Sequence, residues 1–208
     1  MGVEIKLFPI PNDWDVMSDA IAGMQPGYLL QHMGFLFSSL LDGESGEEWF
    51  EDLTLDNEPE CYIKALHSWF DEIKSKPHLL GMYFDGASRG HDHWAYLLEL
   101  AADNEREKEL AHSAIFGSQA VHASAVASQG IPIRWSTAEQ VAQISALISN
   151  REHGQKTEER FDGFPDERVF YKRRSDDQFQ GCMYELDKIR EFYHRASNAN
   201  FAVASILD

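Results

Sequence analysis

The sequence predicts an α+β protein: a single compact domain in which a small mixed sheet packs against several helices. Strand-like patterns occur near both ends, at residues 3–9 and 201–207, and helical periodicities fill much of the chain between them. Of the 208 residues, 43% are hydrophobic and 12% aromatic, which is enough apolar material for one large core. No internal repeat and no long Pro-, Gly- or Ser-rich linker divides the chain, so we expect one domain over residues 1–208.

The first half of the chain predicts helices separated by short breaks. Residues 14–24 and 28–41 carry apolar side chains at helical spacing, with Gln25-Pro26-Gly27 between them. A further helix is expected from Glu58 to about Ile73. Residues 79–84 fit either a short strand or a buried segment, and residues 85–90 have the composition of a loop.

The middle of the chain predicts a helix that begins at His91 or Asp92. Its apolar face has the spacing i, i+3, i+4 and i+7, formed by Trp94, Leu97, Leu98 and Ala101. A charged stretch at residues 103–109 is expected to separate it from an apolar segment at residues 110–116, which Gly117 ends.

The last third predicts a strand followed by three further elements. Residues 131–135 form the expected strand, and Ser136 with Glu139 has the spacing of a capping box at the start of a helix. Residues 150–160 are polar, so we expect them to be exposed. The helix that follows Ser136 is predicted to bury Val141, Ile144, Ser145 and Ile148. A second helix, before the last strand, is predicted to bury Leu186, Ile189, Phe192, Tyr193 and Ala196.

The net charge of −17 is unevenly distributed. Residues 1–110 hold 22 acidic and 7 basic side chains, whereas residues 111–208 hold 13 and 11. A negative field of this size repels nucleic acids and anionic membranes, so we expect neither as a partner. It attracts basic proteins and accelerates their association.

The N-terminal sequence and the cysteines predict an intracellular, cytoplasmic protein. The first residues contain neither a basic segment followed by a long apolar run nor a small-residue cleavage site, and no apolar run reaches the length of a membrane span. The two cysteines, Cys61 and Cys182, are far apart in sequence and are expected to be buried thiols. The oligomeric state does not follow from these features.

The C-terminal half resembles a known family. Residues 135–142 (WSTAEQVA), 186–196 (LDKIREFYHRA) and 201–203 (FAV) are similar to the YfbM-like family of bacterial proteins of unknown function. The Met1-Gly2 start is similar too, and residues 94–98 and 113–117 are similar more loosely. The resemblance is closest over residues 110–208, and the acidic N-terminal half departs from it. It implies a compact intracellular α+β fold, and it implies no catalytic residue.

One group of residues suggests metal chemistry. His91 and His93 flank Asp92, and on an extended backbone two histidines at this spacing can bind one ion, with His112 and His122 from neighbouring elements completing the site. This is the basis of an alternative hypothesis, a small metal-dependent hydrolase or transferase. The structural interpretation is a polar loop and helix start, where Asp92 suits the helix dipole. We expect no bound metal and no cofactor.

Other candidate sites are weaker. Cys182 precedes an expected helix start, which can activate a thiol, but His194 is too distant on that helix to assist it. The basic run at residues 172–174 is expected to be a solvated turn. An aromatic ligand pocket involving Trp69, Trp94 or Trp135 stays open as a third hypothesis, although core packing is the more ordinary role of tryptophan.

The acidic stretch at residues 42–60 is the leading candidate for a functional surface. Nine of its nineteen residues are acidic, none is basic, and aromatic side chains lie among them. Carboxylates would pair with a basic partner while an aromatic side chain fills a pocket. We therefore predict a non-enzymatic binding protein, an inhibitor or immunity protein that neutralises a basic toxin domain. The predicted partner-binding residues are Glu44, Glu47, Glu48, Trp49, Phe50, Glu51, Asp52 and Asp56.

Overall fold

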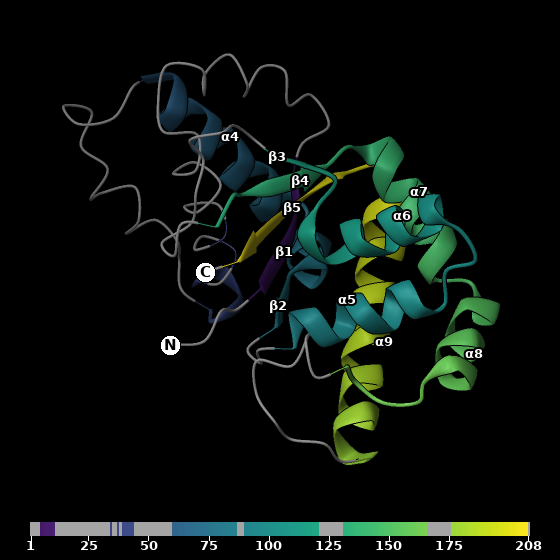
Figure 1. The fold of residues 1–208 in the computed structure, drawn as a ribbon. Helices are drawn as coiled ribbons and strands as arrows, with labels where there is room; N and C mark the ends of the chain where they lie inside the picture. Colours follow the sequence, from purple (N-terminus) through teal and green to yellow (C-terminus); the bar gives the residue numbers. More distant parts are fainter. Residues whose placement is uncertain are drawn as a thin grey trace.

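The computed structural model of the chain describes residues 5–10, 34, 37, 39–43, 60–86, 90–120, 131–165 and 176–207 (Figure 1). These residues form an antiparallel sheet with helices packed against it, which confirms the α+β class. Every described strand pairing is antiparallel. The prediction of a mixed sheet is therefore wrong for the described strands.

The sheet is built around two strands from opposite ends of the sequence. Strand β1 (Ile5–Ile10) pairs with β5 (Ala202–Leu207) over six residues, from Ile5 opposite Leu207 to Ile10 opposite Ala202. The strand order is β2-β1-β5-β4-β3, with β2 at Phe84–Gly86, β3 at Gln119–Ala120 and β4 at Arg134–Ser136. All six residues of β5 are buried, as expected for a central strand.

The helices form an uneven layer around this sheet. Figure 1 shows α5 (His91–Leu100), α6 (Glu105–Phe116), α7 (Ala138–Ile148) and α9 (Asp176–Asn198) on one side of the strands. Helix α8 (Arg151–Arg160) lies at the outer edge of this group. Helix α4 (Glu60–Ser75) lies away from the group, beside the strands, and the 3₁₀ helix η1 (Pro77–Met82) follows it.

Large aromatic side chains fill the core between these layers. Trp69 and Trp94 are each 1% exposed, and Trp69 lies 6.1 Å from Phe37 and 6.0 Å from Phe201 between ring centroids. Trp94 meets Phe84 edge to face at 5.7 Å. Trp135 is half-buried against the same core. The three tryptophans considered for a ligand pocket thus all contribute to packing.

Several predicted elements are confirmed. The first strand, the helix from His91 and the last strand occur as predicted, within two residues at their ends. All the side chains predicted to be buried on α7 and on α9 are buried. Gly117 ends α6 with a positive φ of 74°, in accord with its predicted role as a break.

The capping box of α7 is one residue later than predicted. Ser136 is the last residue of β4, is fully buried, and lies 2.9 Å from Ser118 between hydroxyl oxygens. Thr137 is the N-cap instead: its hydroxyl accepts the backbone N–H of Gln140, and the Gln140 side chain accepts the N–H of Thr137. Strand pairing holds Ser136 in place, so the cap forms at the next hydroxyl.

Of two predictions about charged segments, one is wrong and the other holds in part. Residues 103–109 do not separate two elements, because most of them form the first turns of α6, where Asn104 caps the helix by accepting the N–H of Glu107. Residues 150–160 are polar but not wholly exposed: they form α8 with Asn150 as N-cap, and His153 and Thr157 are buried. In both cases a capping side chain starts a helix that apolar spacing does not reveal.

Candidate functional site

The predicted partner-binding residues lie outside the described residues. This applies to Glu44, Glu47, Glu48, Trp49, Phe50, Glu51, Asp52 and Asp56. Of the acidic stretch at residues 42–60, the structure describes Asp42, Gly43 and Glu60. The described residues do include His91, His93 and Cys182, together with many charged side chains of the helices.

His91 and His93 lie on the first turn of α5 and point to different neighbours. The ring of His91 meets Phe116 of α6 edge to face at 6.1 Å, whereas the ring of His93 meets Phe164 at 4.4 Å. Because helical residues two apart do not face each other, the helix directs the two rings apart. The extended backbone needed for shared ligation is not present at this position.

Burial keeps both histidines neutral near pH 7. Burial is the main cause that lowers the pKa of His91 and of His93, and the nearby Asp92 carboxylate opposes it only in part. Asp92 lies 3.7 Å from the Nε2 atom of His91. His93 is 8% exposed, and its Nε2 lies 3.3 Å from Nε2 of Gln178 on α9.

His112 belongs to a separate pair on the surface. Its Nδ1 lies 2.8 Å from Oε1 of Glu99, and its ring packs at 4.5 Å on Phe116, the same ring that His91 contacts. His122, the other proposed ligand, lies outside the described residues. Across the described ranges, no group of three or more His, Cys, Asp or Glu side chains is arranged to bind a metal ion.

Cys182 is not at a helix start. It lies inside α9, which begins at Asp176, and its side chain is buried. Burial, with a smaller contribution from the Glu185 carboxylate, raises the pKa of the thiol to about 11. The thiolate is therefore disfavoured at neutral pH, which is typical of a structural cysteine and not of a nucleophile.

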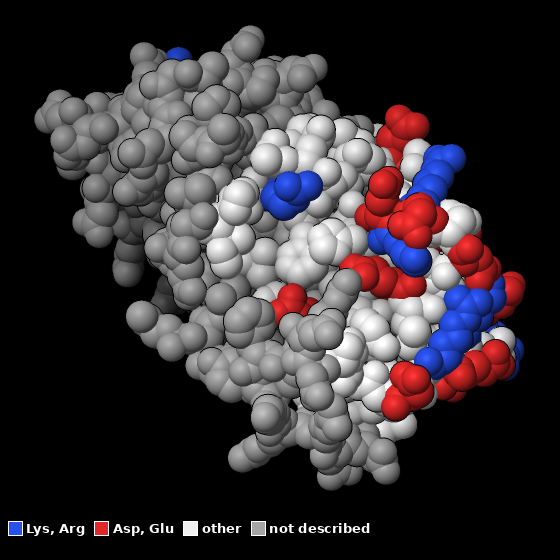
Figure 2. Space-filling view, viewed as in Figure 1, with Lys and Arg blue, Asp and Glu red and all other residues white. Residues whose placement is uncertain are grey.

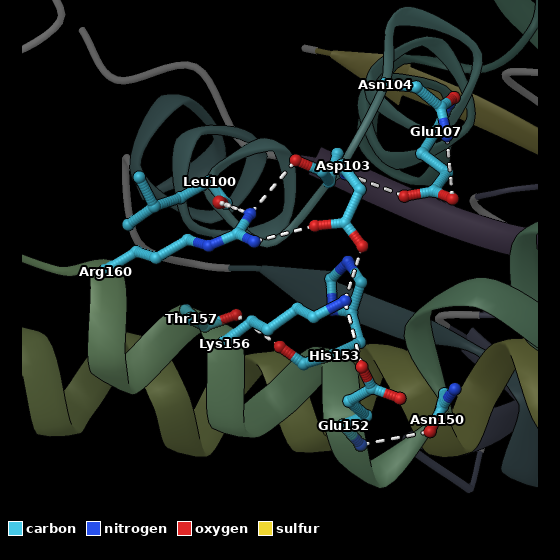
Figure 3. A network of polar contacts seen from close by, with 11 residues as sticks. Leu100, Asp103, Asn104, Glu107, Asn150, Glu152, His153, Lys156, Thr157 and Arg160 are labelled. Atoms are coloured by element: carbon cyan, nitrogen blue, oxygen red, sulfur yellow. Dashed lines mark hydrogen bonds and ion pairs between the residues drawn. The ribbon is translucent and has the colours of Figure 1, made fainter.

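An ionic network on α8 is the most extensive polar arrangement that the sequence analysis missed. Asp103, in the turn between α5 and α6, lies 2.5 Å from Lys156 and 2.6 Å from Arg160 (Figure 3). These two cations hold the pKa of the Asp103 carboxyl below its usual value. Lys156 also lies 3.1 Å from Glu152. Helix α8 buries only two residues, His153 and Thr157, which are four positions apart and both polar. Its sequence therefore lacks the periodic apolar side chains by which an amphipathic helix is recognised.

Many described cations are engaged by the protein's own carboxylates. Ion pairs one helical turn apart join Lys76 to Glu72, Lys108 to Glu105, Lys188 to Glu185, Arg190 to Asp187 and Arg195 to Glu191. Arg134 instead donates to the backbone carbonyls of Gly117 and Ser118, both at 3.0 Å. Figure 2 shows the two signs interleaved along the edge of the molecule where α8 lies.

In the part of the chain that the structure describes, no helix combines the length and the apolar composition that crossing a bilayer requires.

Comparison with known proteins places the chain in a family. No curated protein and no solved structure matches the chain. A family model described as a domain of unknown function (DUF1877) matches residues 44–205, which include α4 to α9 and four of the six residues of β5. The match covers most of the chain, and the chain therefore belongs to the DUF1877 family.

Proposed function

We propose that this chain is a non-enzymatic binding protein that captures a basic protein partner through its negative surface. In its specific form the proposal is an inhibitor or immunity protein that neutralises a basic toxin domain in the cytoplasm. The observation that carries it is the state of the cations. The chain has 35 acidic and 18 basic side chains, and many of the described basic ones are bound to its own carboxylates or backbone carbonyls.

This arrangement leaves a surplus of carboxylates for a partner. Each internal ion pair uses one carboxylate and one basic side chain, so pairing within the chain does not reduce the net charge of −17. Surface ion pairs contribute little to folding stability, but a large uncompensated field raises the association rate of a basic partner. A cleft that is built to bind phosphate groups presents the complementary positive charge.

The acidic stretch at residues 42–60 is the proposed contact region. Most of it falls within the family match, which begins at residue 44. In this region Trp49 and Phe50 lie among five carboxylates at positions 44, 47, 48, 51 and 52. An aromatic anchor surrounded by charges is a common composition for an interaction hot spot. We retain the closer likeness to YfbM-like proteins as part of this proposal.

The test compares two variants of equal net charge. One replaces Glu44, Glu47, Glu48, Glu51 and Asp52 by the corresponding amides. The matched control does the same to five exposed carboxylates elsewhere: Asp71, Glu139, Glu158, Glu159 and Asp162. Each variant has a net charge of −12 in place of −17.

The three proteins serve as baits for lysate of the source organism, at about 50 and 300 mM salt. The captured protein is then purified, titrated against each bait, and assayed for nuclease or other toxin activity. We expect stoichiometric, salt-dependent binding of a basic protein to wild type and control, loss of binding by the first variant, and inhibition on binding. Equal affinity for all three baits, or no specific partner, would reject the proposal.

A further inference from the structure

Helix α8 is attached to the rest of the protein almost entirely by polar contacts. Its sequence, REHGQKTEER, contains no aliphatic side chain, and its two buried residues are His153 and Thr157. Helix α7, by contrast, buries Val141, Ile144 and Ile148 completely. Elements with little apolar burial have the lowest local stability, so α8 is expected to detach more easily than its neighbours.

The outer contacts of α8 converge on the end of α5 and the turn after it. Arg160 donates from Nη1 to the carbonyls of Leu100 and Ala102, both at 3.1 Å, and from Nη2 to Asp103. Lys156 reaches the other oxygen of Asp103. Figure 3 shows both cations pointing from α8 toward this one carboxylate. The loss of one charge at Asp103 would therefore weaken both links.

The inner contact of α8 is made by its own residue His153, whose side chain is buried and only 4% exposed. Among the described residues neither ring nitrogen has a hydrogen-bond partner, and the carbonyl of Leu98 lies close by without completing a hydrogen bond. The buried Nη2 of Arg190 on α9 likewise has no partner in the described part of the chain. Gly154 lies next to Arg190, and a Cβ added there would be 3.7 Å from Nη2, an ordinary contact distance.

The charges around His153 favour its neutral form. Arg190 from α9 and Lys156 from α8 itself both oppose a positive ring, while Glu107 from α6 and the Leu98 carbonyl from α5 favour one. Burial is the largest influence, and together these lower the pKa of His153 to about 4. In the docked helix a proton on this ring would thus be placed beside two cations with no nearby acceptor in hydrogen-bonding geometry.

We propose that α8 is an acid-sensitive latch, which detaches from α5 and α9 as a unit under mildly acidic conditions while the sheet and the other helices stay folded. His153 acts first, because its docked form requires a neutral ring, and Asp103 acts second, because its carboxylate holds Lys156 and Arg160. This inference does not depend on the proposed partner.

The sign and the pH range follow from the two groups. The pKa of His153 is lower when docked than when exposed, so its contribution to docking is complete above about 6.5 and is lost progressively toward about 4. The pKa of Asp103 is also lowered, so its contribution is present above its unfolded value and is lost as the pH falls through the docked value. Opening therefore begins with His153.

The test is amide hydrogen exchange at pH 7.5 and pH 5.0, at micromolar protein concentration, with exchange times corrected for the intrinsic rate. From pH 7.5 to 5.0 the opening equilibrium of α8 should rise roughly ten- to thirtyfold. Peptides from α7 and α9 should change little. If α8 shows no extra exchange at pH 5.0, or exchanges in step with α9 at both pH values, the latch does not exist.

Two variants separate the two groups. His153→Leu removes the titrating ring and should abolish the pH dependence of α8 exchange. Asp103→Asn should increase α8 exchange already at pH 7.5 and keep the pH dependence. An unchanged pH dependence in His153→Leu would overturn the role of His153. A measurement on wild type alone adds an independent check: because docking opposes protonation, the ring resonances of His153 should titrate with a midpoint clearly below 6.5, and a midpoint near 6.5 would contradict the proposal.

Discussion

At the scale of single residues, Gly117 has the strictest conformational requirement in the described part of the chain that we can relate to a contact. Its φ of 74° and ψ of 154° lie in a region that is almost exclusive to glycine. A Cβ here would lie 2.8 Å from Cβ of Arg134 and 2.9 Å from the backbone nitrogen of Trp135. The junction of α6 with β3 and β4 therefore depends on the absence of a side chain.

Gly117→Ala should lower the free energy of unfolding by about 2–4 kcal/mol, because backbone strain and the clash with β4 add. Gly181→Ala is the matched control: Gly181 lies exposed within α9, and an added Cβ meets nothing within 4 Å. That substitution should raise the free energy of unfolding by about 0.5–1 kcal/mol. Urea denaturation followed by circular dichroism measures both, and equal midpoints for the two variants would refute the argument.

At the scale of elements, the start of α7 shows how tertiary contacts select a cap. The residues Ser136-Thr137 offer two hydroxyls in succession, and Glu139-Gln140 offers two possible partners. Strand pairing of Ser136 with Val203 and its contact with Ser118 engage the first hydroxyl, which leaves Thr137 and Gln140 to form the box.

Thr137→Ala should therefore destabilise the protein by about 1 kcal/mol, the ordinary cost of losing an N-cap. Glu139→Ala should have an effect of only a few tenths of a kcal/mol, since Glu139 is exposed and its side chain has no part in the cap. Thermal unfolding of the two variants and the wild type compares them. A larger loss for Glu139→Ala than for Thr137→Ala would favour the capping box inferred from the sequence.

The same elements show how far sequence patterns reach. Apolar periodicity located β1, β5 and the buried faces of α7 and α9, because those segments bury side chains at a regular spacing. It could not find α8, whose buried face consists of His153 and Thr157. Helix boundaries that depend on a hydrogen bond from another strand, as at Ser136, also have no local signal.

The candidate site was less predictable than the fold for a related reason. His91 and His93 form a ligand pair only on an extended backbone, and the helix that begins at His91 sends the two rings to Phe116 and Phe164. Helix periodicity predicted that start, so this part of the outcome could have been inferred. The pairing of Asp103 with Lys156 and Arg160 could not, because it joins residues more than 50 positions apart.

At the scale of the whole molecule, two electrostatic effects oppose each other. Local ion pairs such as Lys156 with Asp103 are attractive and weaken when salt is added. The net charge of −17 is repulsive, and salt weakens that repulsion as well. Exposed pairs each contribute only about 0–1 kcal/mol, whereas the repulsion sums over every surplus carboxylate.

Repulsion should therefore dominate, and added salt should stabilise the protein. We expect the melting temperature at pH 7.5 to rise by several degrees between about 10 and 300 mM NaCl, measured by circular dichroism. Choline chloride at the same ionic strength is the control, because screening predicts a similar rise with either cation. A rise with Na⁺ alone would indicate specific ion binding.

A fall with both salts would mean that the local pairs, including the links of α8 to Asp103, outweigh the surplus charge. In that case α8 should be the first element to lose protection from exchange as salt is added.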